Sequence, residues 1–117
     1  MAQPYLDMLS QTITSLELST SERVTLECRH FFSGAALYAN GKICASLTPA
    51  GFGVKLPRAV RNRMIDEKEG TALRYFENAP IKQEYIALSQ TIIEYPTKIK
   101  SLLVQSIEYV LERERAA

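Results

Sequence analysis

The chain has 117 residues, of which 46% are hydrophobic and 23% are charged, and its formal net charge is +1. These values are typical of one compact domain over residues 1–117, and they exclude intrinsic disorder and fibrous repeats. The near balance of charge argues against a protein whose main task is electrostatic binding of nucleic acid.

The N-terminal residues 1–12 show no basic region ahead of an apolar run, so we expect no secretory signal. The longest uncharged stretches, 31–41 and 43–54, are too short to span a bilayer. We therefore expect a cytoplasmic protein without a membrane segment, in which Cys28 and Cys44 are free thiols.

The first predicted element is a helix over residues 4–17, because its apolar residues recur at a spacing of three to four after Pro4. From Val24 to His30 the apolar period changes to two, which predicts a strand. The pair Asn40-Gly41 lies between two further apolar runs. It predicts a hairpin with a type I′ turn, since both central residues of that turn need positive φ.

This turn predicts the register of the hairpin and the two faces of its strands. Expected partners across the turn are Ala39 with Lys42, Tyr38 with Ile43, Leu37 with Cys44, Ala36 with Ala45 and Gly34 with Leu47. One face is expected to pack on helices and carries Tyr38, Ile43, Ala36, Ala45 and Leu47. The other face is small and apolar. It is a candidate association face, formed by Ala35, Leu37, Ala39 and Cys44, unless it reflects the ordinary scatter of exposed apolar residues.

The remaining elements follow from turns at prolines and glycines. We expect a strand through Phe52, Val54 and Leu56, a helix from Pro57 to near Gly70, strands over 72–77 and 84–90, and a last helix from Pro96. Consecutive strands are joined by short turns rather than by helices. The predicted fold class is therefore α+β, with a two-layer, mostly antiparallel sheet of about six strands and helices packed on one face.

Two groups of residues have a functional interpretation and a structural one. Cys28 and His30 share a strand face, so they form a possible nucleophile and base, but burial beside Val24 and Leu26 would make Cys28 an inert core thiol. The densest basic cluster is a candidate nucleic-acid contact and consists of Lys55, Arg58, Arg61 and Arg63. The alternative is a solvated helix face that the acidic residues of 66–69 balance.

The tyrosines Tyr75, Tyr85 and Tyr95 either line a pocket or belong to the core. One histidine with two cysteines falls short of the four ligands of a closed zinc site, so we expect no metal. We also expect no cofactor, because residues 51–53 lack the sequence context of a phosphate-binding loop.

Residues 29–42 resemble the signature of the TfoX N-terminal domain family, which is Arg, one residue, Met-Phe-Gly-Gly, a short spacer, Tyr, two residues and Gly-Lys. The matching positions are Arg29, Phe32, Gly34, Tyr38, Gly41 and Lys42. Phe31 replaces the usual Met and Ser33 replaces the first Gly, which changes a position where the backbone can require Gly. The likeness continues through residues 53–56 and Tyr85 into the last helix.

The resemblance implies a non-enzymatic regulatory or interaction module, linked to transcriptional regulation of competence genes through a protein partner such as a transcription regulator. It supplies no catalytic residues. We expect a stand-alone domain, because the sequence leaves no room for the helical C-terminal domain of full TfoX regulators, and a homodimer formed through the association face. Direct nucleic-acid binding through 55–63 and a small enzyme that uses Cys28 and His30 are the alternatives.

Overall fold

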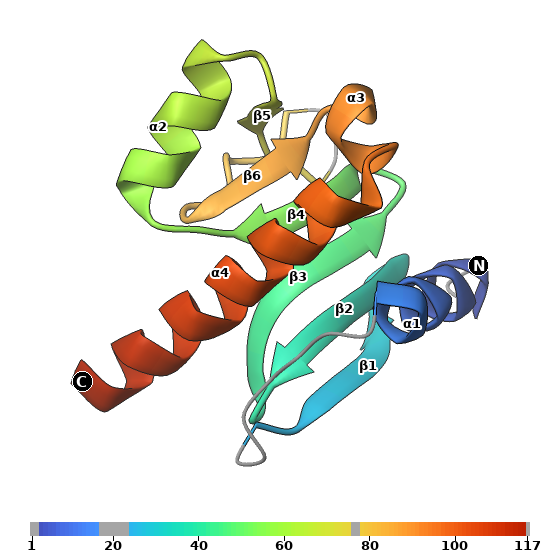
Figure 1. Cartoon of the computed structure of the whole chain (residues 1–117). Coiled ribbons are helices and arrows are strands. Elements are labelled where there is room, and N and C mark those ends of the chain that lie inside the picture. Colours follow the sequence, from blue (N-terminus) through green and yellow to red (C-terminus); the bar gives the residue numbers. More distant parts are fainter. Residues whose placement is uncertain (1–2, 17–23, 76–77, 117) are drawn as a thin grey trace.

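The protein is described by a computed structural model that covers residues 3–16, 24–75 and 78–116. Within these ranges it forms a six-stranded antiparallel sheet with four helices (Figure 1), which confirms the α+β fold class. The strand order is β1-β2-β3-β4-β6-β5. The elements are α1 (Gln3–Leu16), β1 (Leu26–Phe31), β2 (Gly34–Ala39), β3 (Lys42–Thr48), β4 (Gly51–Lys55), α2 (Arg58–Asp66), β5 (Gly70–Ala72), β6 (Tyr85–Leu88), α3 (Gln90–Ile93) and α4 (Pro96–Ala116).

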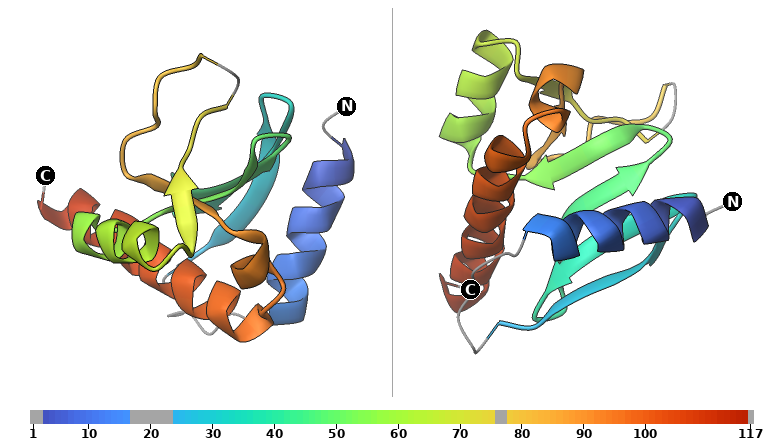
Figure 2. Two further views of the ribbon diagram at one scale, coloured as in Figure 1. Left: turned by 90° about the horizontal axis from the view of Figure 1, so that it is seen from above. Right: turned by 45° about the vertical axis from the view of Figure 1, so that its right-hand side comes forward.

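The main core lies between one face of the sheet and the helices α1 and α4. Leu9 of α1 and Leu103 of α4 are fully buried there, against Leu37, Val54 and Ile86 of the strands. The apolar residues of α4 recur every three to four positions, so they form one stripe along the side that meets the sheet. The first view of Figure 2 shows both helices on one side of the sheet and the chain that follows β5 on the other side.

The hairpin turn forms as predicted, with φ of 49° at Asn40 and 82° at Gly41. The pairs nearest the turn, which join Tyr38 to Ile43 and Ala39 to Lys42, are confirmed. Beyond them a β-bulge shifts the register, and Leu37 pairs with Ala45 instead of Cys44. The predicted partners of Ala36 and Gly34 are wrong for the same reason. One extra residue on a strand moves every later pair by one position.

The predicted association face is wrong, because the structure buries it. The side chains of Ala35, Leu37, Ala39 and Cys44 are all 0% exposed and belong to the core under α1 and α4. Small residues let the helices approach the sheet closely, and the Ser106 hydroxyl of α4 donates a hydrogen bond to the Cys44 carbonyl at 2.8 Å. The expected helix-covered face is also corrected. Its members Ala36, Tyr38 and Ile43 lie on the opposite side of the sheet, whereas Ala45 and Leu47 pack with the core as expected.

Three further boundaries differ from the sequence predictions. The middle helix ends at Asp66, and Gly70 begins β5 instead of closing the helix. The strand expected over 72–77 is wrong at residues 73–75, which leave the sheet, while residues 76–77 lie outside the described ranges. The short helix α3 was not predicted, and the Ser89 hydroxyl caps its start by accepting a hydrogen bond from the Ile92 amide.

None of the helices in the described part of the chain combines the length and the apolar character that crossing a membrane needs.

Candidate functional site

The face of the sheet opposite α1 and α4 has a floor of small residues. Ala36, Ser46 and Gly53 are paired across β2, β3 and β4, so they form one row on this face. All three are buried. Because the row carries so few side-chain atoms, another part of the chain has room to pack on it.

Residues 73–75 and 78–84, which we call the covering segment, occupy that room. Leu73 is 1% exposed and lies over Gly53. A Cβ atom added to Gly53 would lie only 2.6 Å from the Cδ2 atom of Leu73. The Tyr75 and Ser46 hydroxyls are hydrogen-bonded at 3.0 Å. The Lys82 amide donates to the Leu73 carbonyl at 2.8 Å, which joins the two ends of the segment. Through these contacts Leu73 and Tyr75 pack directly onto the row of small residues.

Between the covering segment and the sheet lies an open cavity of about 790 Å³. Its wall consists of residues 31–33 and 79–85 together with Ile43, Thr48, Lys55 and Tyr75. Among the described residues of this wall, eight are apolar or aromatic and six are polar or charged. A cavity of this volume and composition is typical of sites that bind small molecules, which measure about 300–1,000 Å³.

Four aromatic rings meet along one wall of the cavity. The ring centroids of Phe31 and Phe32 are 4.6 Å apart, and those of Phe31 and Tyr75 are 5.7 Å apart. Tyr75 in turn contacts Tyr85 edge to face, with a centroid distance of 6.4 Å. The rings come from the end of β1, the β1–β2 turn, the covering segment and β6, so only the folded chain assembles them. Of the three tyrosines singled out in the sequence, Tyr75 and Tyr85 line the cavity and Tyr95 does not.

Phe32 stands at the rim of the cavity in an unfavourable backbone conformation. Its φ is 51°, in the left-handed region that bulky residues rarely adopt, and its side chain is 78% exposed. The resemblance placed the position where the backbone can require glycine at Ser33, but the positive φ falls one residue earlier, on Phe32. An exposed aromatic ring held at a cost of about 1–3 kcal/mol is a feature that clusters at functional sites.

We expect Phe32→Asn to raise the free energy of unfolding by about 0.5–1 kcal/mol, because Asn tolerates positive φ far better than Phe. Urea denaturation followed by far-UV circular dichroism measures this change. Ser33→Asn is the matched control, since Ser33 has no positive φ to relieve. An equal gain in both variants would contradict backbone strain at Phe32.

Two lysine ammonium groups lie over tyrosine rings of the cavity wall. The Nζ atom of Lys55 is 5.6 Å from the ring centroid of Tyr85, and the Nζ atom of Lys82 is 5.9 Å from that of Tyr75. Both distances fall within the range of cation–π contacts. The acidic group of the wall is Glu84, whose carboxylate accepts a hydrogen bond from the Tyr109 hydroxyl at 2.7 Å.

The tyrosine hydroxyls of the wall stay neutral at physiological pH. Burial raises the pKa of Tyr75, and its hydrogen bond to Ser46 opposes only part of that shift. Burial, with the neighbouring Tyr75, also raises the pKa of Tyr85. Neither hydroxyl is therefore prepared to act as a base or nucleophile, and both are suited to binding.

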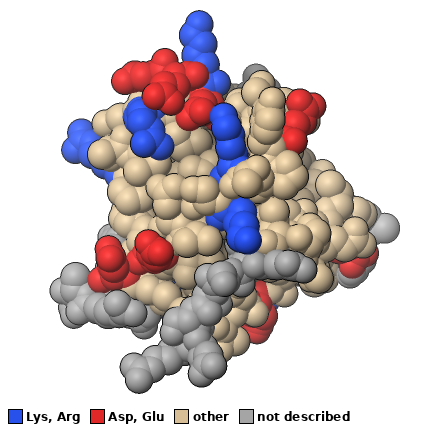
Figure 3. Space-filling view, in the orientation of Figure 1, with Lys and Arg blue, Asp and Glu red and all other residues tan. Residues whose placement is uncertain are grey.

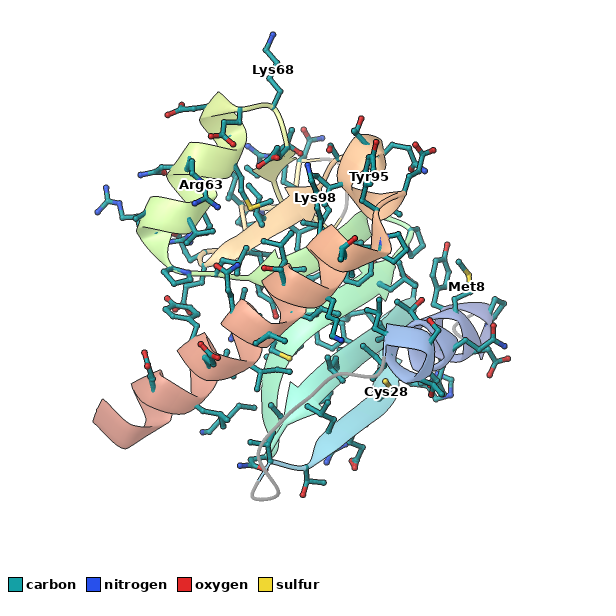
Figure 4. The ribbon with its side chains drawn as sticks, viewed as in Figure 1. Met8, Cys28, Arg63, Lys68, Tyr95 and Lys98 are labelled. Carbon is teal, nitrogen blue, oxygen red and sulfur yellow. The ribbon has the colours of Figure 1, made fainter. Side chains whose placement is uncertain are left out.

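The two cysteines are not activated. Cys28 on β1 lies beside α1 (Figure 4), and burial raises its pKa despite a contact with the Ser10 hydroxyl. Cys44 is buried in the main core, where desolvation raises its pKa to about 12. A catalytic thiol needs a lowered pKa, so the structure favours the core interpretation of Cys28. His30 shares the helix-covered side of β1 with Cys28 and is exposed.

The predicted nucleic-acid contact is divided between two places. Lys55 lies on β4 in the cavity wall, whereas Arg58, Arg61 and Arg63 lie on α2. Figure 3 shows basic and acidic side chains close together over the α2 end of the molecule. Arg58 and Arg63 are exposed, but the Arg61 Nε atom is buried without a described hydrogen-bond partner. Nucleic-acid binding stays a prediction, to be tested by salt-dependent titration of DNA with Arg58→Glu and Arg63→Glu.

Within the described ranges, no three His, Cys, Asp or Glu side chains lie close enough together to hold a metal ion. No protein-family model matches the chain, and no curated protein matches it either. The TfoX resemblance therefore stays a prediction, and the cavity on the sheet face opposite α1 and α4 is the candidate functional site.

Proposed function

We propose that this protein is a non-enzymatic binding module that takes a small, largely apolar molecule into the cavity beneath the covering segment. The observation that carries the proposal is the aromatic-walled cavity of about 790 Å³ on the sheet face that the helices leave open. This role agrees with the regulatory or interaction module that the TfoX resemblance implies. It moves the recognition site from the buried association face to the opposite side of the sheet.

Three properties of the wall support binding rather than chemistry. The rings of Phe31, Phe32 and Tyr75 offer flat apolar surfaces for a planar molecule. The hydrogen bond between Tyr75 and Ser46 fixes one ring before any ligand arrives, which lowers the entropy cost of binding. Burial raises the pKa of Tyr75 and Tyr85, so both hydroxyls keep their protons and neither is suited to act as a base.

The test uses 2-naphthalenemethanol, a neutral planar molecule that fits this volume. We expect saturable shifts of backbone amide resonances in two-dimensional NMR spectra, concentrated in residues 31–33 and 79–85. Phe32→Asn should weaken binding about fivefold, because the variant loses one ring from the wall. The same variant is expected to be the more stable protein, so weaker binding cannot be ascribed to unfolding.

Tyr95→Asn is the matched control, since Tyr95 is 52% exposed, does not line the cavity and lies on the helix-covered side together with Met8 (Figure 4). It should bind the probe as the wild type does. Failure of the wild type to bind at millimolar probe, or shifts spread evenly over the surface, would overturn the proposal.

A further inference from the structure

We propose that the ligand of the cavity combines an aromatic body with one anionic group, as in an aromatic carboxylate, and that Lys55 and Lys82 recognise the anion. This inference rests on the proposed function, because it assigns a chemical class to the molecule that the cavity takes.

The Lys55 and Lys82 ammonium groups are held at the cavity wall from two sides. Lys55 is paired with Tyr85 across β4 and β6, so the sheet itself holds the Lys55 backbone beside that ring. Lys82 is held from the other side, where its amide bonds to Leu73 and its ammonium lies over Tyr75. Since the rings of Tyr75 and Tyr85 touch edge to face, the two ammonium groups flank one aromatic corner of the wall.

The Lys82 ammonium group keeps hydrogen-bonding capacity for a ligand. An ammonium carries three donors, and a ring face below it engages only one side of the group. Among the residues that the structure describes, no carboxylate lies within ion-pair distance of Lys82. A ligand carboxylate at this corner would therefore receive charge-assisted hydrogen bonds while its aromatic body stacks on the rings.

The described wall of the cavity carries more basic than acidic residues. It contains the two lysines and one acidic residue, Glu84. The Tyr109 hydroxyl of α4 donates to a Glu84 carboxylate oxygen, so part of that acceptor capacity is used by the protein. The formal charges of the described wall residues sum to +1, which favours an anionic ligand over a neutral or cationic one of the same shape.

Three probes with the same naphthalene ring test the inference: 2-naphthoate, 2-naphthalenemethanol and 2-naphthylmethylammonium. We expect 2-naphthoate to bind about tenfold more tightly than the alcohol at low salt, by NMR titration, and the ammonium compound to bind most weakly. The advantage of 2-naphthoate should shrink as salt is added, whereas the affinity for the alcohol should not fall.

Lys82→Gln and Lys55→Gln should each lower the affinity for 2-naphthoate about fivefold and leave that for the alcohol within about twofold. Lys98→Gln is the matched control, since the Lys98 ammonium also lies over a ring, 5.4 Å from the centroid of Tyr95, but outside the cavity. It should leave the affinity for both probes unchanged.

The outcomes separate the two proposals. Equal affinity for the three probes, with no effect of either cavity lysine, would overturn anion recognition and leave apolar binding in place. Tightest binding of the ammonium compound would also overturn anion recognition, because it would show that the Glu84 carboxylate attracts a cation. If Lys98→Gln lowered the affinity for 2-naphthoate as much as Lys82→Gln does, the preference for the anion would come from the general surface charge and anion recognition by the cavity lysines would be overturned. Absence of binding by all three probes would overturn the proposed function itself.

Discussion

Gly34→Ala should lower the free energy of unfolding by about 3 kcal/mol, at the upper end of the usual cost of overpacking. A Cβ atom at this position would lie 2.2 Å from the Leu47 carbonyl oxygen and 2.7 Å from the Thr48 Cα atom. Both neighbours are backbone atoms of β3. They cannot rotate away as a side chain can, so β2 and β3 would have to separate where they pair. Urea denaturation followed by far-UV circular dichroism measures the loss.

Two other glycine variants make the comparison quantitative. Gly41→Asn should cost well under about 1 kcal/mol, because the turn residue has open space around it and Asn tolerates its φ of 82°. Gly53→Ala should fall between the two, since its nearest neighbour is the flexible end of Leu73. Equal losses in Gly34→Ala and Gly41→Asn would show that close backbone approach is not what requires Gly34.

Leu37→Glu should unfold the chain, with a loss of about 4 kcal/mol or more. Leu37 is 0% exposed in the core between β2 and the helices, where a carboxylate would find no water. The group would either remain charged at a large desolvation cost or take up a proton and still lack partners. Circular dichroism and the dispersion of amide resonances report the loss of structure.

Met8→Glu is the matched control, because Met8 is 54% exposed on α1 and the substitution has the same chemistry. It should change stability by no more than about 0.5 kcal/mol. A Leu37→Glu variant that stays folded and only dissociates from a dimer in light scattering would contradict the burial of Leu37. It would restore the association face that the sequence suggested.

The cavity could be anticipated only in part from the sequence. Tyr75 and Tyr85 attract attention as aromatic residues near predicted strands, but pattern alone does not separate a pocket from a core. Phe32 belongs to the same wall, although it is distant from Tyr75 in the chain. The sequence does carry one indirect signal, which is the presence of small side chains rather than of functional groups. The small residues Ala36, Ser46 and Gly53 fall on three successive strands, and only the correct register shows that they form one row, on which the covering segment packs.

The faces of the sheet show why the register could not be predicted. Counting outward from the Asn40-Gly41 turn works for two pairs, and then the bulge at Cys44 reverses the orientation of every later residue of β3. The extra residue of this bulge, Cys44, is a small apolar residue of the kind found throughout these strands, so its type does not mark the bulge. The strand pattern also does not show which face of the sheet the helices cover. For that reason the sequence predicted an exposed association face where the structure has a buried one.

By itself the sequence determined the α+β class, the hairpin turn and the helical stripe of α4, because these depend on residues close together in the chain. Backbone conformation at Asn40 and Gly41 and apolar spacing are local properties. Only the tertiary structure decided which face of the sheet is buried, how Tyr75 reaches Ser46 and where Lys55 and Lys82 meet the aromatic wall. Those choices depend on packing between distant segments, which follows from the volume and shape of the whole core.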